Sequence, residues 1–77
     1  MNNHMYEYNK YYDHVNRGWA AMLDDMHSDT VWIASRCGPS SDGRWSYRDR
    51  VESGGYTRRY FFCDSEDYVA FVMVRDR

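Results

Sequence analysis

Residues 5–26 read MYEYNKYYDHVNRGWAAMLDDM, and their spacing decides the fold expected for this chain. Apolar or aromatic side chains recur there at intervals of three and four residues, as one face of an α-helix requires, whereas a strand needs a repeat of two. These positions are Met5, Tyr8, Tyr12, Val15, Trp19, Met22 and Met26. We therefore predict one long amphipathic helix over about residues 5–26, with this stripe buried against the rest of the domain.

The middle of the chain has the composition of strands. Residues 30–36 (TVWIASR) are rich in β-branched and aromatic side chains, so we expect a strand there. Residues 44–52 alternate between apolar and polar side chains, and a second apolar run follows the glycines Gly54 and Gly55. This pattern predicts a β-hairpin over residues 44–63.

The C-terminal segment allows two interpretations. Asp64 is a candidate helix N-cap, and residues 65–71 fit a short helix followed by a few extended residues. Alternation at Tyr68, Ala70, Val72 and Val74 also fits a strand. The predicted class is α+β: a long N-terminal helix on an antiparallel sheet of three strands, or four if this segment is extended.

Length and composition limit the architecture and the partners. A chain of 77 residues forms a single domain, here taken as residues 1–77. The net charge of −2 provides no general attraction to nucleic acid, although the residues around the hairpin are rich in arginine. Aromatic residues make up 18% of the chain, and such side chains serve both in cores and at interfaces.

The hairpin provides the main candidate binding surface. A two-residue turn at Gly54-Gly55 would pair Val51 with Arg58, Asp49 with Tyr60 and Tyr47 with Phe62. Trp45, Tyr47, Tyr60 and Phe62 would then face the helix, and Arg48, Arg50, Arg59 and Phe61 would lie on the other face. A three-residue turn would instead bring Arg58 beside Arg48 and Arg50. The candidate partner-binding residues are Arg44, Arg48, Arg50, Arg58, Arg59 and Phe61.

The predicted helix provides a second candidate contact. A helix of 22 residues is about 33 Å long, whereas a seven-residue strand spans about 23 Å. The helix would therefore extend beyond its sheet, and Met5, Tyr8 and Tyr12 are the predicted dimer or partner contacts. The stripe itself is better explained as the protein's own core, and a helix–helix dimer is the alternative.

Catalytic and metal-binding patterns are missing from the sequence. His4, His14 and His27 lack the i,i+4 spacing of a metal-binding helix, and no CxxC motif occurs. We expect no enzyme activity, no cofactor and no metal. Cys37 and Cys63 are expected as small buried residues, with a disulfide between them the alternative. No signal peptide or run of about 20 apolar residues is present, so we expect a cytoplasmic protein with no membrane partner.

These features favour a small, non-enzymatic interaction protein that binds and modulates or inhibits a larger protein or ribonucleoprotein complex. A phage-encoded inhibitor of host defence, of the anti-CRISPR kind and acting in the host-cell cytoplasm, has this general character. The alternative is nucleic-acid or phosphate binding through the arginine and aromatic side chains of the hairpin. The oligomeric state is left open between a monomer and a homodimer.

Overall fold

The computed structural model describes residues 6–75. The first half of the chain forms strand β1 (Tyr6–Asp13), the single helical turn α1 (His14–Arg17) and the long helix α2 (Trp19–Cys37). The second half forms the short 3-10 helix η1 (Ser40–Asp42), strands β2 (Trp45–Glu52) and β3 (Gly55–Phe62), and helix α3 (Ser65–Arg75).

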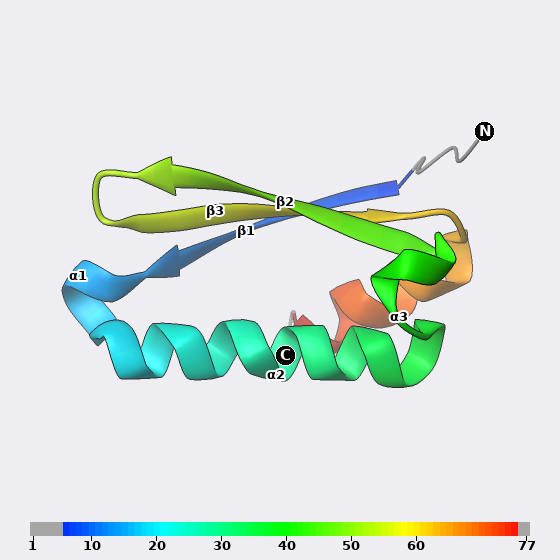
Figure 1. Ribbon diagram of the computed structural model, residues 1–77, viewed down its shortest axis with the longest axis horizontal. Coiled ribbons are helices and arrows are strands. Elements are labelled where there is room, and N and C mark those ends of the chain that lie inside the picture. The colour runs from blue at the N-terminus through cyan, green and yellow to red at the C-terminus, as the bar shows by residue number, and fades with distance from the viewer. Residues whose placement is uncertain (1–5, 76–77) are drawn as a thin grey trace.

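The strands form one antiparallel sheet in the order β1-β3-β2, which places β3 at its centre. Helices α2 and α3 both lie on the same side of this sheet (Figure 1). We call the side that they cover the inner face and the opposite side the outer face. The predicted class is confirmed, since a long helix packs on a three-stranded antiparallel sheet and the chain continues into a C-terminal helix.

The position of the long helix was predicted wrongly. Residues 6–13 form a strand, α2 begins only at Trp19, and Met5 lies outside the described residues. The strand has its own repeat of two, because exposure alternates from Tyr6 through Tyr12, which is 1% exposed. Tyr8 and Tyr12 are four residues apart, and that spacing fits both a helix and a strand.

Local capping interactions explain why the strand ends at Asp13 and the helices begin after it. The Asp13 side chain accepts hydrogen bonds from the backbone amides of Val15 (2.9 Å) and Asn16 (3.1 Å), which is the geometry of a helix N-cap. The single turn α1 that follows ends at Gly18, whose φ of 85° favours glycine. Asp13 and Gly18 thus turn the chain from the sheet into the helical layer.

The strand predicted over residues 30–36 is also wrong, because this segment is the second half of α2. The stripe that α2 buries consists of Met22, Met26, Asp29, Ile33 and Cys37. A carboxylate stands in the middle of this stripe, so the apolar period is interrupted. Gly38, with a φ of 83°, caps the end of α2, and Pro39 follows it.

The hairpin was predicted correctly, with a different register. Its turn consists of Ser53 and Gly54, and the strands pair Glu52 with Gly55 and Tyr47 with Tyr60. The pairing differs by two residues from that expected for a Gly54-Gly55 turn, and a shift of two leaves every side chain on its predicted face. Gly55 belongs to the central strand, where a Cβ atom would lie 1.9 Å from the Tyr12 carbonyl oxygen.

Helix α3 extends over the whole of Ser65–Arg75, so the extended residues expected at its end do not occur and the sheet has no fourth strand within residues 6–75. The predicted N-cap is confirmed, since an Asp64 carboxylate oxygen accepts a hydrogen bond of 2.9 Å from the Glu66 amide. Phe71, on the buried side of α3, joins the helix to the sheet. Its ring centroid lies 5.0 Å from that of Tyr60 and 5.6 Å from that of Phe62.

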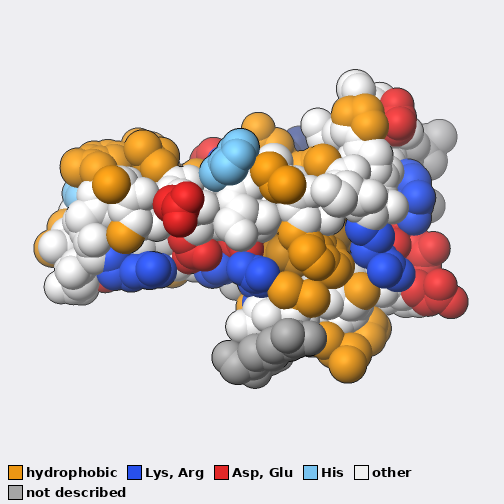
Figure 2. All heavy atoms as spheres, turned by 90° about the horizontal axis from the view of Figure 1, so that it is seen from below, with side chains coloured by type: hydrophobic (Ala, Val, Ile, Leu, Met, Phe, Trp, Pro, Cys, Tyr) orange, Lys and Arg blue, Asp and Glu red, His pale blue; other side chains and the backbone are white. Residues whose placement is uncertain are grey.

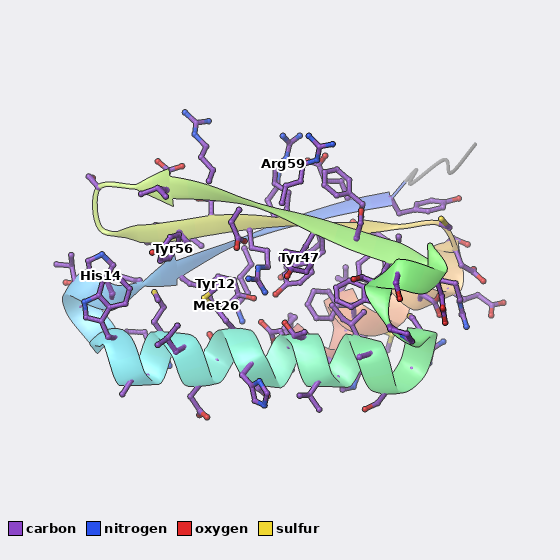
Figure 3. The ribbon with its side chains drawn as sticks, viewed as in Figure 1. Tyr12, His14, Met26, Tyr47, Tyr56 and Arg59 are labelled. Atoms are coloured by element: carbon purple, nitrogen blue, oxygen red, sulfur yellow. The ribbon has the colours of Figure 1, made fainter. Side chains whose placement is uncertain are left out.

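The end of the molecule around α1 is closed by stacked rings. The His14 imidazole lies parallel to the Trp19 indole at 4.1 Å, and Trp19 meets the edge of Tyr56 at 6.2 Å. Figure 3 shows His14 and Tyr56 at this end of the molecule, near α1. These contacts fix the corner at which the chain leaves β1 and enters α2.

We expect the fold to lose stability at alkaline pH. Burial raises the pKa of the Cys37 thiol from 9.0 to about 11, and burial together with the hydrogen bond to Asp29 raises the pKa of Tyr12. The unfolded chain therefore releases these protons first, and stability that is complete below pH 9 falls as the pH rises toward 11. For the thiol alone the loss is about 2–3 kcal/mol. Urea unfolding across this range measures it, and a constant free energy of unfolding would contradict it.

Candidate functional site

The outer face of the sheet is the candidate site. Strand pairing places side chains from all three strands there, because directly opposed residues of an antiparallel sheet project to the same side. Figure 3 shows Arg59 rising from the sheet away from α2, while Tyr12 and Tyr47 lie between the sheet and α2. The outer face consists of Glu7, Asn9, Tyr11, Ser46, Arg48, Arg50, Glu52, Thr57, Arg59 and Phe61.

Two arginines lie directly opposite each other at the centre of this face. Arg48 of β2 is the register partner of Arg59 of β3, which in turn is the partner of Asn9 of β1. Like charges in this position repel and destabilise the strand pair. Arg59 forms an ion pair with Glu7 at 3.0 Å, whereas no carboxylate of residues 6–75 lies within ion-pair distance of Arg48. The centre of the outer face therefore carries an uncompensated positive charge.

A depression of about 410 Å³ adjoins this arginine pair, and Asn9, Arg48, Arg50, Thr57 and Arg59 are among the residues that line it. Glu52 and Asp49 also line it, and Asp49 is paired with Arg58. Glu52 lies 3.6 Å from Arg50, whose side chain is 80% exposed. An ion pair this exposed contributes little to stability, so Arg50 can readily leave Glu52 for another partner.

Two aromatic rings lie beside the arginines on this face. Phe61 lies two residues from Arg59 along β3, and the Arg59 guanidinium is 5.6 Å from its ring centroid. Tyr11 lies near the hairpin turn, opposite Thr57, and is 48% exposed. The face therefore combines guanidinium groups with two accessible or partly accessible rings.

Four of the predicted binding residues are placed together by the structure: Arg48, Arg50, Arg59 and Phe61 share the outer face as expected. The residues that β1 adds to this surface were not predicted, because residues 6–13 were assigned to a helix. The alternation of Glu7, Asn9 and Tyr11 with inward-facing side chains is the signal that could have found them.

Arg58 does not belong to this surface, so the pairing that placed it beside Arg48 and Arg50 is wrong. It lies on the inner face and is only 8% exposed. Its guanidinium donates two hydrogen bonds to Asp49, of 2.7 and 3.0 Å, and lies 4.2 Å from the Tyr47 ring centroid. Nη1 of Arg58 also donates to the Thr30 hydroxyl. These contacts give Arg58 a structural role between the sheet and α2.

Arg44 is likewise committed to contacts within the protein. It donates a hydrogen bond of 2.8 Å to Asp67, which also accepts one of 3.0 Å from Arg36. Burial alone would raise the pKa of Asp67, but the hydrogen bonds from Arg36 and Arg44 hold it below its usual 3.8. This cluster joins the end of α2 and the start of β2 to α3.

Tyr8 and Tyr12, which were predicted as dimer or partner contacts at an exposed helix end, lie instead on β1 and face the interior of the protein. Tyr12 is buried, and its hydroxyl lies 2.5 Å from both Asp29 and the Tyr60 hydroxyl. Tyr8 is half-buried with its ring against the edge of Phe71 at 5.3 Å. The stripe from Tyr8 to Met26 is divided among β1, α1 and α2, so it presents no continuous helical surface to a second copy.

A buried polar cluster lies beneath the sheet. The fully buried carboxylate of Asp29 accepts hydrogen bonds from Lys10 (2.9 Å), Arg75 and the Tyr12 hydroxyl. These residues come from β1, α2 and α3, so the cluster ties three elements together. Each side chain in it has a partner within the fold, which is typical of a structural network, although Nε of Arg75 is buried without a hydrogen-bond partner among residues 6–75.

The helical side of the molecule differs in composition from the outer face of the sheet (Figure 2). Hydrophobic side chains are exposed there together with acidic, basic and histidine side chains. Leu23 and Val31 of α2, and Val69 and Met73 of α3, are each 48% exposed or more. These residues belong to two helices, and the exposed Asp24 is also on α2.

Neither a metal site nor a disulfide is found within residues 6–75. No group of three His, Cys, Asp or Glu side chains in this range comes close enough together to hold a metal ion. Cys37 and Cys63 are both free thiols, Cys37 buried and Cys63 half-buried, so a disulfide between them is not formed. In the same part of the chain, no helix has the length and hydrophobicity needed to cross a bilayer.

Comparison of the chain with protein-family models, characterised proteins and solved structures found no match. The functional interpretation therefore rests on the geometry of the outer face.

Proposed function

We propose that this chain is a small, non-enzymatic binding protein that captures a larger macromolecule with the outer face of its sheet. One observation carries this proposal: α2 and α3 pack on the same side of the sheet, and the face that they leave open has two opposed arginines at its centre. Arginine and aromatic side chains dominate the binding energy of many interfaces.

The chemistry of the face fits binding better than catalysis. Its central side chains are guanidinium groups, an amide, a hydroxyl and aromatic rings, which donate hydrogen bonds or stack. Binding alone is sufficient for the activity expected from the sequence, since a small protein can inhibit a larger protein or ribonucleoprotein complex by occupying a working surface. A phage-encoded inhibitor of host defence is included in this proposal on that basis.

Two sets of substitutions test which face binds. Changing Arg48, Arg50 and Arg59 together to alanine should leave the fold intact, because these side chains are exposed, but should abolish capture of the partner from the native host. The matched set, Leu23, Val31 and Met73 to alanine, changes three exposed side chains on the helices and should leave capture unchanged. Affinity capture with mass spectrometry reads out both, and circular dichroism checks the fold. The reverse pattern would place the binding surface on the helices.

A further inference from the structure

We infer that the outer face binds single-stranded nucleic acid, with a phosphate group held between Arg48 and Arg59. This inference rests on the proposed function and specifies the chemistry of the partner at the same surface. It starts from the two directly opposed guanidinium groups, of which only Arg59 has a carboxylate partner within residues 6–75.

A phosphate between the two arginines removes their repulsion. Opposed residues in an antiparallel pair have Cβ atoms about 4.5–5.5 Å apart, so two arginine side chains can reach one anion from both sides. The planar guanidinium matches phosphate oxygens with pairs of parallel hydrogen bonds. The adjoining depression of about 410 Å³ gives the anion and its neighbouring sugar room on the sheet.

A second anionic group can be held one step along the sheet. Arg50 follows Arg48 by two residues, which places it about 7 Å away along the strand on the same face. Asn9 and Thr57 lie beside these arginines in the lining of the depression and offer neutral hydrogen-bonding groups. The arginines therefore form a short basic track rather than a single charged point, as an extended polyanion requires.

The flanking rings favour a single strand over other anionic partners. Phe61 lies beside the Arg48–Arg59 pair, and Tyr11 lies level with Arg50, on the other side of Thr57. Unstacked bases pack on aromatic side chains, and this contact is available only when the bases are not paired within a duplex. An acidic polypeptide offers negative charge but does not have an aromatic base at every charged unit.

The net charge of −2 for the whole chain does not describe this face. Asp24 and Asp25 lie on α2, and Asp64 and Glu66 lie at the start of α3, on the other side of the sheet. The outer face contains three arginines against Glu7 and Glu52, and Asp49 also lines the depression. Each of these carboxylates is already paired with an arginine. We therefore expect modest affinity with strong salt dependence.

Fluorescence anisotropy with a labelled single-stranded RNA of about twelve nucleotides tests the inference. The wild-type chain should bind this probe at low salt and should bind a duplex of the same sequence more weakly. Arg48→Glu should weaken binding by roughly tenfold or more and lower the slope of log affinity against log salt by about 0.7. Arg17→Glu, the same charge change at an exposed position of α1, should change affinity less than about twofold. Phe61→Leu, which keeps an apolar side chain but removes the ring, should weaken binding by roughly fivefold.

Three results would overturn the inference: no binding at low salt, equal losses for Arg48→Glu and Arg17→Glu, or competition by polyglutamate as effective as that by unlabelled RNA. The last would assign the face to an acidic polypeptide. If RNA binding is absent but the Arg48, Arg50 and Arg59 substitutions still abolish capture of a protein partner, the inference fails and the proposed function stands.

Discussion

Replacing Phe71 with alanine is expected to cost about 3–5 kcal/mol of unfolding free energy, which is most of the stability of a domain of this size. Phe71 is fully buried and its ring meets those of Tyr8 of β1, Trp32 of α2 and Tyr60 of β3. The cavity left by alanine would therefore loosen α3, α2 and the sheet together. Urea unfolding followed by tryptophan fluorescence measures the change.

The matched control for this substitution is Val69→Ala. Val69 is on the same helix but 50% exposed, and alanine is the better helix former, so the free energy of unfolding should change by less than about 0.5 kcal/mol. A loss below about 1 kcal/mol for Phe71→Ala would mean that α3 is not packed on the sheet as described.

Replacing Asp29 with alanine should destabilise the protein by a similar amount, about 3–5 kcal/mol. The carboxylate is fully buried and accepts hydrogen bonds from Lys10, Arg75 and the Tyr12 hydroxyl. Without it, two positive charges and a buried hydroxyl lose their common acceptor, and such groups are costly when left unpaired. Asp29→Asn keeps an acceptor oxygen but loses the charge, so an intermediate loss is expected.

Asp24→Ala is the control for the Asp29 cluster. Asp24 is on the same helix but exposed, and it should contribute less than about 0.5 kcal/mol. Thermal and urea unfolding of the three variants at neutral pH give the comparison. Equal stability of Asp29→Ala and Asp24→Ala would show that the cluster does not hold β1, α2 and α3 together.

The class of the fold and the hairpin could be predicted from sequence because their signals are local. Trp45, Tyr47, Tyr60 and Phe62 share the inner face as expected, since alternation along each strand fixes the faces even when the register is wrong by two residues. The predicted turn was one residue too far along the chain because glycine is typical of turns. Gly55 instead lies in β3, where the backbone of β1 comes too close to leave room for a Cβ atom.

The first half of the chain was misassigned because its decisive contacts are not local. The stripe of α2 contains Asp29, and this position is compatible with burial only because Lys10 is 19 residues earlier and Arg75 is 46 residues later. Without those partners in view, the buried carboxylate looks like the polar end of a preceding helix. Residues 30–36 then look like a strand, because β-branched and aromatic side chains are also compatible with a buried helix.

The candidate site was predicted in part for the same reason. Arg48, Arg50, Arg59 and Phe61 follow from alternation within the hairpin alone. Asn9 and Tyr11 come from β1, which pairs with β3 across almost fifty residues of sequence, and no local pattern indicates that pairing. Arg58 could not be placed until the turn was known, because a change of one residue in the turn moves it to the other face.

Site-specific photocrosslinking tests most directly whether the outer face is the binding surface. A photoreactive phenylalanine derivative in place of Tyr11, which keeps an aromatic ring on the outer face, is predicted to crosslink to the bound macromolecule, RNA or protein. The same derivative in place of Ser28, exposed on α2, is predicted to give no crosslink. Crosslinks from position 28 and none from position 11 would contradict the account and transfer the binding surface to the helices.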